Sequence, residues 1–106
     1  MDVWEALASA PGFDWDEGNL DKNLDKHAVA FWEAEEIFFN LPLVVLPDVK
    51  HSASEGRFYA LGKTDAGRRL FLVFTLRETL IRVISTRDMT RRELAAFRHY
   101  ETKRDS

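Results

Sequence analysis

Four arginines gather where a strand is expected to end and a helix to begin. Arg82, Arg87, Arg91 and Arg92 fall within eleven residues of the stretch L-I-R-V-I-S-T-R-D-M-T-R-R-E-L at 80–94. Such a place suits a phosphate, because backbone N–H groups at a helix N-terminus and the guanidinium fork both bind anionic oxygens. The pattern therefore indicates a phosphate-binding site. The alternative is that these are solvated surface arginines.

The residue types present fit one reaction that needs no metal. Cleavage of RNA through its 2′-hydroxyl needs a base, a cation on the phosphorane-like transition state and an acid for the leaving 5′-oxygen. Arginine suits the second role, because its planar fork contacts phosphate bidentately. Candidates for the proton transfers are Lys26, His27, His51 and Tyr59. The same types are common on inert surfaces, so chemistry alone leaves both interpretations open.

Other kinds of site are not supported by the spacing. The histidines His27, His51 and His99 form no H-x-x-x-H pair and have no carboxylate at metal-ligand spacing, so we expect no metal and no other cofactor. No G-x-S-x-G elbow surrounds Ser52, and the five glycines are scattered. These patterns argue against a serine hydrolase and a nucleotide triphosphatase. The chain also has no cysteine, which excludes disulfides and thiolate chemistry.

The elements expected to position these residues form an α+β domain. Apolar residues at helical spacing predict two helices ahead of a sheet, and the T-x-x-E capping box at 90–93 predicts a last helix from Arg91. Alternating or apolar runs bounded by turns predict four antiparallel strands between them. The expected ranges are a short amphipathic arm within 1–12, helices at 17–27 and 31–39, and strands at 43–46, 57–62, 70–75 and 80–84, with 85–87 leading out of the last strand.

The spacing within the fourth strand limits what its arginines can share. Successive side chains of a strand point to opposite faces, and Arg82 and Arg87 are five residues apart. They serve one site only if the strand bends or ends before Arg87. Otherwise one of them is structural, and Glu33 is a carboxylate with which it could pair.

Charge is divided unevenly along the 106 residues. Residues 1–50 hold three Lys/Arg against eleven Asp/Glu, a net of −8, whereas residues 51–106 hold twelve against seven, a net of +5. A basic part could meet a polyanion while an acidic part meets a basic partner, or the halves could neutralise each other. The acidic N-terminus differs from a signal peptide, and no apolar run approaches the ~20 residues of a membrane span. We expect a single domain that acts in the cytoplasm and contacts no membrane.

Several short segments form a recognisable series along the chain. They are F-D-W-D at 13–16, N-L-D-K-H at 23–27, F-W-E-A at 31–34, H-S-x-S-E-x-R-F at 51–58, A-L-G at 60–62, I-R-V-I-S-T-R at 81–87 and R-R-E at 91–93. Taken in this order, they resemble the BrnT family of toxins from bacterial type II toxin–antitoxin systems, and their order and spacing over residues 13–98 make the resemblance specific. We expect an extension at 1–12, one toxin domain at 13–102 and a frayed tail at 103–106.

The resemblance implies a RelE-like fold, in which two helices precede a four-stranded antiparallel sheet and one follows it. It implies a metal-independent endoribonuclease that inhibits translation by cutting RNA. It also implies a cognate BrnA-like antitoxin with a ribbon-helix-helix domain, and a toxin–antitoxin hetero-oligomer that binds DNA only through the antitoxin. Carried over by position, the catalytic candidates are Arg57, Arg82, Arg87, Lys26 and His27, and the RNA-binding candidates are Arg91, Arg92 and Arg98.

A second function fits the same resemblance. The chain could be a catalytically inert interaction module that keeps the fold and the antitoxin-binding surface, and acts only in complex assembly and operon autorepression. A credible general base separates the two functions, and the sequence does not place Lys26, His27, His51 or Tyr59 relative to the arginines. In both cases, we expect a basic antitoxin to bind largely through the acidic N-terminal half.

Overall fold

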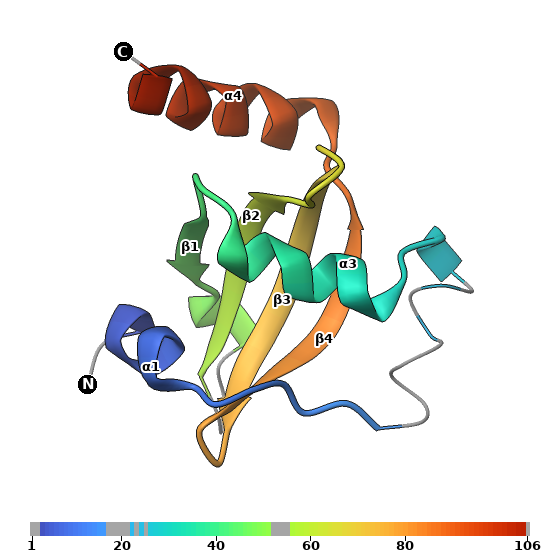
Figure 1. Cartoon of the computed structure of the whole chain (residues 1–106), viewed down its shortest axis with the longest axis vertical. Coiled ribbons are helices and arrows are strands. Elements are labelled where there is room, and N and C mark those ends of the chain that lie inside the picture. The colour runs from blue at the N-terminus through green and yellow to red at the C-terminus, as the bar shows by residue number, and fades with distance from the viewer. Residues whose placement is uncertain (1–2, 17–21, 23, 25, 52–55, 106) are drawn as a thin grey trace.

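The structure, a computed structural model, describes residues 3–16, 22, 24, 26–51 and 56–105 (Figure 1). Four antiparallel strands lie in the order β1-β2-β3-β4, with helices before and after them, so the predicted α+β class is confirmed. In chain order the elements are α1 (Val3–Ser9), α3 (Phe31–Glu36), the 3-10 helix η1 (Ile37–Phe39), β1 (Val44–Pro47), the 3-10 helix η2 (Val49–His51), β2 (Arg57–Lys63), β3 (Arg69–Arg77), β4 (Leu80–Asp88) and α4 (Arg91–Asp105).

Two of the predicted ranges need correction. Residues 85–87 do not lead out of the last strand, because β4 stays paired with β3 as far as Asp88. The helix predicted at 31–39 is an α-helix only to Glu36 and then tightens into η1. Most of the helix predicted at 17–27 lies outside the described residues, although Lys22, Leu24 and residues 26–27 are helical.

The core lies between α3 with η1 and one face of the sheet (Figure 1). Ala34 and Ile37 are fully buried there against Leu72 and Phe74 of β3 and Val83 of β4. Gly62 of β2 allows this close approach, because a Cβ at that position would lie 2.8 Å from the Cβ of Ile37. The absence of a side chain at Gly62 therefore allows η1 to lie this close to the sheet.

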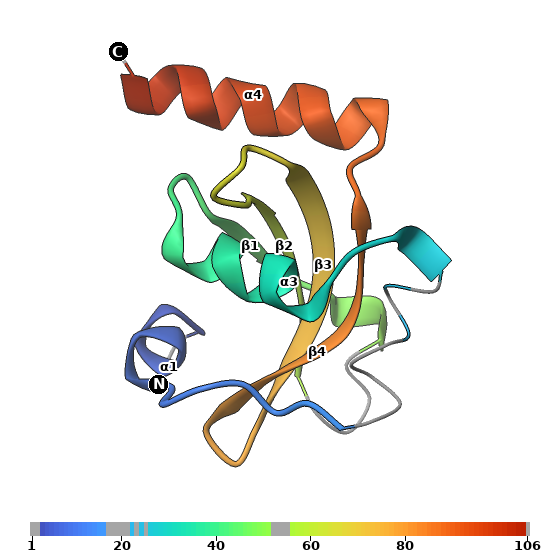
Figure 2. The ribbon, with the colours of Figure 1, turned by 45° about the vertical axis from the view of Figure 1, so that its right-hand side comes forward.

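The segment before α3 runs along the start of β4. The Asp14 N–H donates to the Ile81 carbonyl at 2.9 Å, and the Ile81 N–H donates to the Gly12 carbonyl at 3.1 Å, which makes a short parallel bridge at Phe13. Ahead of this bridge, the side chains of α1 pack against the edge of the core, and α1 lies beside the sheet in both views (Figure 2). The predicted arm is thus a helix docked on the domain.

The last helix lies across the end of the sheet where β3 begins and β4 ends (Figure 1). Phe97 of this helix is fully buried. The Glu101 carboxylate accepts hydrogen bonds from Arg69 at 2.9 and 3.0 Å and lies 3.5 Å from the Lys63 ammonium. Hydrogen bonding to Arg69 lowers the pKa of Glu101, so this ion pair helps to hold α4 in place.

We predict that Gly62→Ala lowers the free energy of unfolding by about 1–3 kcal/mol, because the added methyl overpacks the contact with Ile37. Urea denaturation measures the change. Gly56→Ala is the matched control, since its Cβ would meet only a ring atom of Phe58 at 3.6 Å. We expect the control to stay within about 0.5 kcal/mol of wild type. Equal stabilities of the two variants would contradict the packing described for Gly62.

Candidate active site

A β-bulge brings the two arginines of β4 to one face of the sheet. At Ile84 the pairing of β4 with β3 shifts register, so β4 carries one extra residue between Arg82 and Arg87. An extra residue reverses the alternation of side chains beyond it. Arg82 consequently lies opposite Thr75 and Arg87 opposite Phe71, and these two residues of β3 are four apart and share a face. Arg82 and Arg87, five residues apart, therefore share a face because the strand bulges between them, and not because it ends before Arg87.

The second strand adds Arg57 to the same face. Arg57 pairs with Thr75, which pairs on its other side with Arg82, so the three residues form one cross-strand row. Neighbours in such a row have Cβ atoms ~5 Å apart. Tyr59 lies one row further along, between this row and the one that contains Arg87. We call the surface of Arg57, Tyr59, Thr75, Arg82 and Arg87 the arginine face.

Carboxylates of the F-D-W-D segment bind Arg82. The alternation of an extended chain sends Phe13 and Trp15 toward the rings of η1 and α3, and it sends Asp14 and Asp16 toward Arg82. The Arg82 guanidinium lies 2.7 Å from Asp16 and 3.4 Å from Asp14. The Arg82 side chain is 19% exposed and that of Asp16 is 55% exposed, so the pair sits at the border between protein and solvent.

Arg87 joins the arginine face to the start of α4. Its guanidinium donates to both carboxylate oxygens of Glu93, at 2.8 and 3.0 Å, and lies 4.1 Å from the ring centre of Phe71. Glu93 also accepts from the Thr90 N–H at 2.9 Å, while the Glu93 N–H donates to the Thr90 hydroxyl at 3.2 Å. The predicted capping box is therefore confirmed, and its carboxylate is shared with Arg87. Hydrogen bonding to Arg87 is the main cause that lowers the pKa of Glu93.

Tyr59 is paired with a carboxylate that the sequence analysis did not consider. Its hydroxyl donates to Asp48, and this hydrogen bond is the main cause that raises the pKa of Tyr59, followed by desolvation. Asp48 follows β1, is only 4% exposed, and donates its N–H to the Arg57 carbonyl at 2.8 Å. The position of Asp48 directly after the strand β1 is the feature of the sequence that could have pointed to it. Tyr59 stays protonated at neutral pH and so is a proton donor in the middle of the face.

Arg68 also makes contacts that the sequence analysis did not predict. Its guanidinium donates to both oxygens of Asp88 at 2.7 and 3.0 Å, to Glu33 at 3.3 Å, and to the carbonyls of Ala28 at 2.8 Å and His27 at 3.3 Å. Glu33 therefore pairs with Arg68 and with neither arginine of β4. Hydrogen bonding to Arg68 lowers the pKa of Asp88.

These contacts place the described helical residues Lys22, Leu24, Lys26 and His27 along the outer edge of β4 (Figure 2). At one end, the Lys22 ammonium donates to the carbonyl of the bulge residue Ile84 at 3.0 Å. At the other end, the His27 carbonyl accepts a hydrogen bond from Arg68, which also binds Asp88 at the end of β4. Lys26 and His27 are both exposed. The structure thus brings Lys26 and His27 to the edge of β4.

The remaining predicted site residues lie on other elements. Arg91, Arg92 and Arg98 are exposed on α4, beyond the end of the sheet that carries Arg87. For His51 only the backbone is described, in η2. Within the described ranges, no group of three His, Cys, Asp or Glu side chains is arranged to hold a metal ion. Over the same ranges, no helix is both long and apolar enough to cross a membrane.

We predict that Arg68→Ala lowers the free energy of unfolding by about 1–2 kcal/mol at neutral pH, a modest loss because Asp88 can be rehydrated. Asp88 has a lowered pKa in the folded state, so its contribution is present above its unfolded pKa of about 4 and is lost as pH falls through the folded value. The stability difference between wild type and variant should therefore shrink in acid. Denaturant unfolding at several pH values tests this, with the exposed Arg98→Ala as control. A difference independent of pH would contradict the pairing.

One comparison with known proteins found a match. A family model described as "Ribonuclease toxin, BrnT, of type II toxin-antitoxin system" matches residues 15–93. No curated protein matches the chain. The matched range contains the whole sheet, the arginine face, Arg68 and the capping box at Glu93, and it leaves out α1 and most of α4. Because the match covers most of its length, the chain belongs to the BrnT family of ribonuclease toxins of type II toxin–antitoxin systems.

Proposed function

We propose that this chain is a metal-independent endoribonuclease that binds the scissile phosphate of RNA on the arginine face. The observation that carries the proposal is the bulge at Ile84, since it aligns Arg82 and Arg87 with Arg57 and leaves Tyr59 between them. Cations convergent on one small surface suit a phosphorane-like transition state. The description of the family as ribonuclease toxins supports the same chemistry.

Arg82 is proposed as the main phosphate ligand, with Arg57 beside it in the same row. Arg82 is already oriented by Asp14 and Asp16, and the more exposed Asp16 is the partner that a phosphate oxygen would replace. Arg82 exchanges one charge-assisted hydrogen bond for another, and the released Asp16 carboxylate, 55% exposed, is hydrated by solvent, so the exchange costs little. Arg87 is held by Glu93 and Phe71, and it borders the site and orients α4.

Tyr59 is proposed as the general acid. Its hydroxyl is protonated at neutral pH and donates to the buried Asp48, so to act as the acid it would turn from Asp48 and deliver that proton to the leaving 5′-oxygen. For the base we propose Lys26 or His27 at the β4 edge of the face. The exposed Arg91, Arg92 and Arg98 of α4 would bind the RNA backbone on either side of the cleaved bond.

The wider role follows from the family as an expectation. We propose that RNA cleavage inhibits translation in the cytoplasm, and that a BrnA-like ribbon-helix-helix antitoxin forms a hetero-oligomer with the toxin and supplies its DNA binding. The family implies a cognate antitoxin but not its type. One observation favours an inert module instead, since Arg82 and Arg87 both already pair with carboxylates.

We predict that Arg82→Lys impairs RNA cleavage in the presence of EDTA and that Arg82→Ala loses roughly a hundred-fold in rate. Both variants should stay within about 1 kcal/mol of wild-type stability, because the pair is partly exposed. Cleavage of a defined RNA and thermal unfolding measure the two effects. Full activity of Arg82→Ala would remove Arg82 from the site, loss of wild-type activity with EDTA would contradict a metal-free mechanism, and absence of any cleavage would favour the inert module.

A second prediction concerns the general acid. Tyr59→Phe keeps the ring contact with Phe71 but loses the proton, so cleavage of RNA should fall by about a hundred-fold or more. A ribonucleoside 3′-(4-nitrophenyl phosphate) needs no protonation of its leaving group, so its cleavage should be nearly unaffected. Tyr100→Phe, at an exposed site on α4, is the matched control. An equal loss on both substrates would assign Tyr59 to the scaffold.

A further inference from the structure

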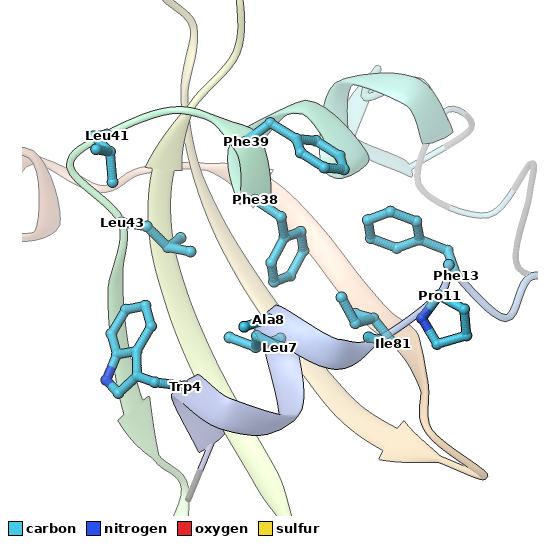
Figure 3. A pocket seen from close by; sticks show the side chains of 12 residues that line it. Trp4, Leu7, Ala8, Pro11, Phe13, Phe38, Phe39, Leu41, Leu43 and Ile81 are labelled. Atoms are coloured by element: carbon cyan, nitrogen blue, oxygen red, sulfur yellow. The ribbon is translucent and has the colours of Figure 1, made fainter.

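An apolar groove lies between α1 and the segment that leads from η1 into β1 (Figure 3). Its volume is about 390 Å³, and its walls include Trp4 and Leu7 of α1, Phe38 and Phe39 of η1, and Leu41. We call it the α1 groove. Three of these side chains remain well exposed: Trp4 at 50%, Phe39 at 78% and Leu41 at 58%. Large exposed apolar side chains grouped around a concave surface are typical of a site that another protein covers.

The α1 groove is separate from the arginine face. Ile81 lines the groove, whereas its neighbour Arg82 belongs to the arginine face, and adjacent residues of a strand point to opposite faces. A partner in the groove therefore lies on the opposite side of the sheet from the proposed phosphate site. It would not have to displace RNA in order to bind.

The charge around the groove indicates what kind of partner fits it. The two segments that build most of its walls, residues 3–16 and 28–48, contain no Lys, Arg or His. Arg82 and Arg68 balance part of their acidic charge, but both approach from the sheet. A nucleic acid would be repelled here and a basic protein surface attracted. Of the seven acidic residues in these segments, Asp14 and Asp16 pair with Arg82, Glu33 pairs with Arg68 and Asp48 is buried beside Tyr59, which leaves Glu5 of α1 with Glu35 and Glu36 of α3.

One wall of the groove lies outside the stretch that the family model matches. Trp4, Leu7 and the rest of the wall as far as Phe13 precede residue 15, where the family match begins. Side chains outside the common domain suit discrimination between related partners, since related toxins need not share them. The groove is therefore suited to selecting the antitoxin of this toxin from among others.

We propose that the α1 groove binds a basic amphipathic helix of the cognate antitoxin, with the apolar side chains of the helix among Trp4, Phe39 and Leu41. A short groove with aromatic walls fits anchors at helical i, i+3 and i+4 spacing. Basic residues on the flanks of such a helix would meet walls that lack cations and, on α1, the exposed Glu5. The inference rests on the proposed pairing with an antitoxin. It does not rest on RNA cleavage.

The experiment compares groove variants with matched controls that lie elsewhere. The probe is the purified full-length antitoxin encoded beside this chain, and fluorescence anisotropy gives its Kd. We expect Trp4→Ala and Leu41→Ala to weaken binding by at least about tenfold. Trp32→Ala and Leu46→Ala replace the same residue types at similar exposure, 56% and 54%, outside the groove. They should stay within about twofold of wild type, and the wild-type association rate should fall as salt rises.

Several results would overturn the proposal. These are groove variants that bind as tightly as wild type, controls that lose as much as the groove variants, or an association rate that salt does not change. If Trp4→Ala instead converts a dimer of the toxin alone into a monomer, the occupant is a second copy. Thermal unfolding checks that each variant folds. If Trp4→Ala does not fold, Leu41→Ala alone tests the groove. RNA cleavage is assayed separately. If the chain cuts no RNA but its antitoxin binding still depends on the groove, the result contradicts the proposed ribonuclease activity and leaves the groove proposal standing.

Discussion

The arrangement around β4 depends on the position of one guanidinium, that of Arg68. It lies just before β3, and it meets Asp88 at the end of β4, Glu33 in α3 and the carbonyls of His27 and Ala28. Arginine suits this role because its five donors lie in one plane, so it can satisfy carboxylates and carbonyls from several elements at once. The turn before α3 is thereby fixed against the sheet, and with it His27 at the edge of β4.

Three arginines of the sheet, Arg69, Arg82 and Arg87, follow the same pattern, each tied to a carboxylate from an element that does not belong to the sheet. Arg82 meets Asp16 of the N-terminal segment, and Arg69 meets Glu101 of α4. Partly exposed ion pairs contribute little to stability. What they supply is orientation, since each guanidinium is held by a partner that an incoming anion could replace. A surface built in this way would suit the phosphate binding proposed for the arginine face.

The uneven charge of the chain now has a physical explanation. Acidic residues of the first half reach basic residues of the second across the fold, as Asp14 and Asp16 do at Arg82 and Glu33 does at Arg68. Part of the asymmetry is thus internal neutralisation. The remainder is spatial, because the elements around the α1 groove lack cations, whereas α4 exposes several. Internal neutralisation therefore accounts for the paired residues, and binding of partners by the rest stays a prediction.

The sequence by itself determined the elements and the family. Local patterns predicted the four strands, the capping box at Glu93 and the start of α4, because periodicity and capping depend on residues only a few positions apart. It did not determine which face Arg82 and Arg87 share, since a bulge at Ile84 depends on how β4 packs as a whole. Nor did it give Arg82 its partner Asp16, a contact between residues 66 positions apart. Only the tertiary structure brings such distant charges together, because the packing of the core, and not local spacing, decides which elements meet.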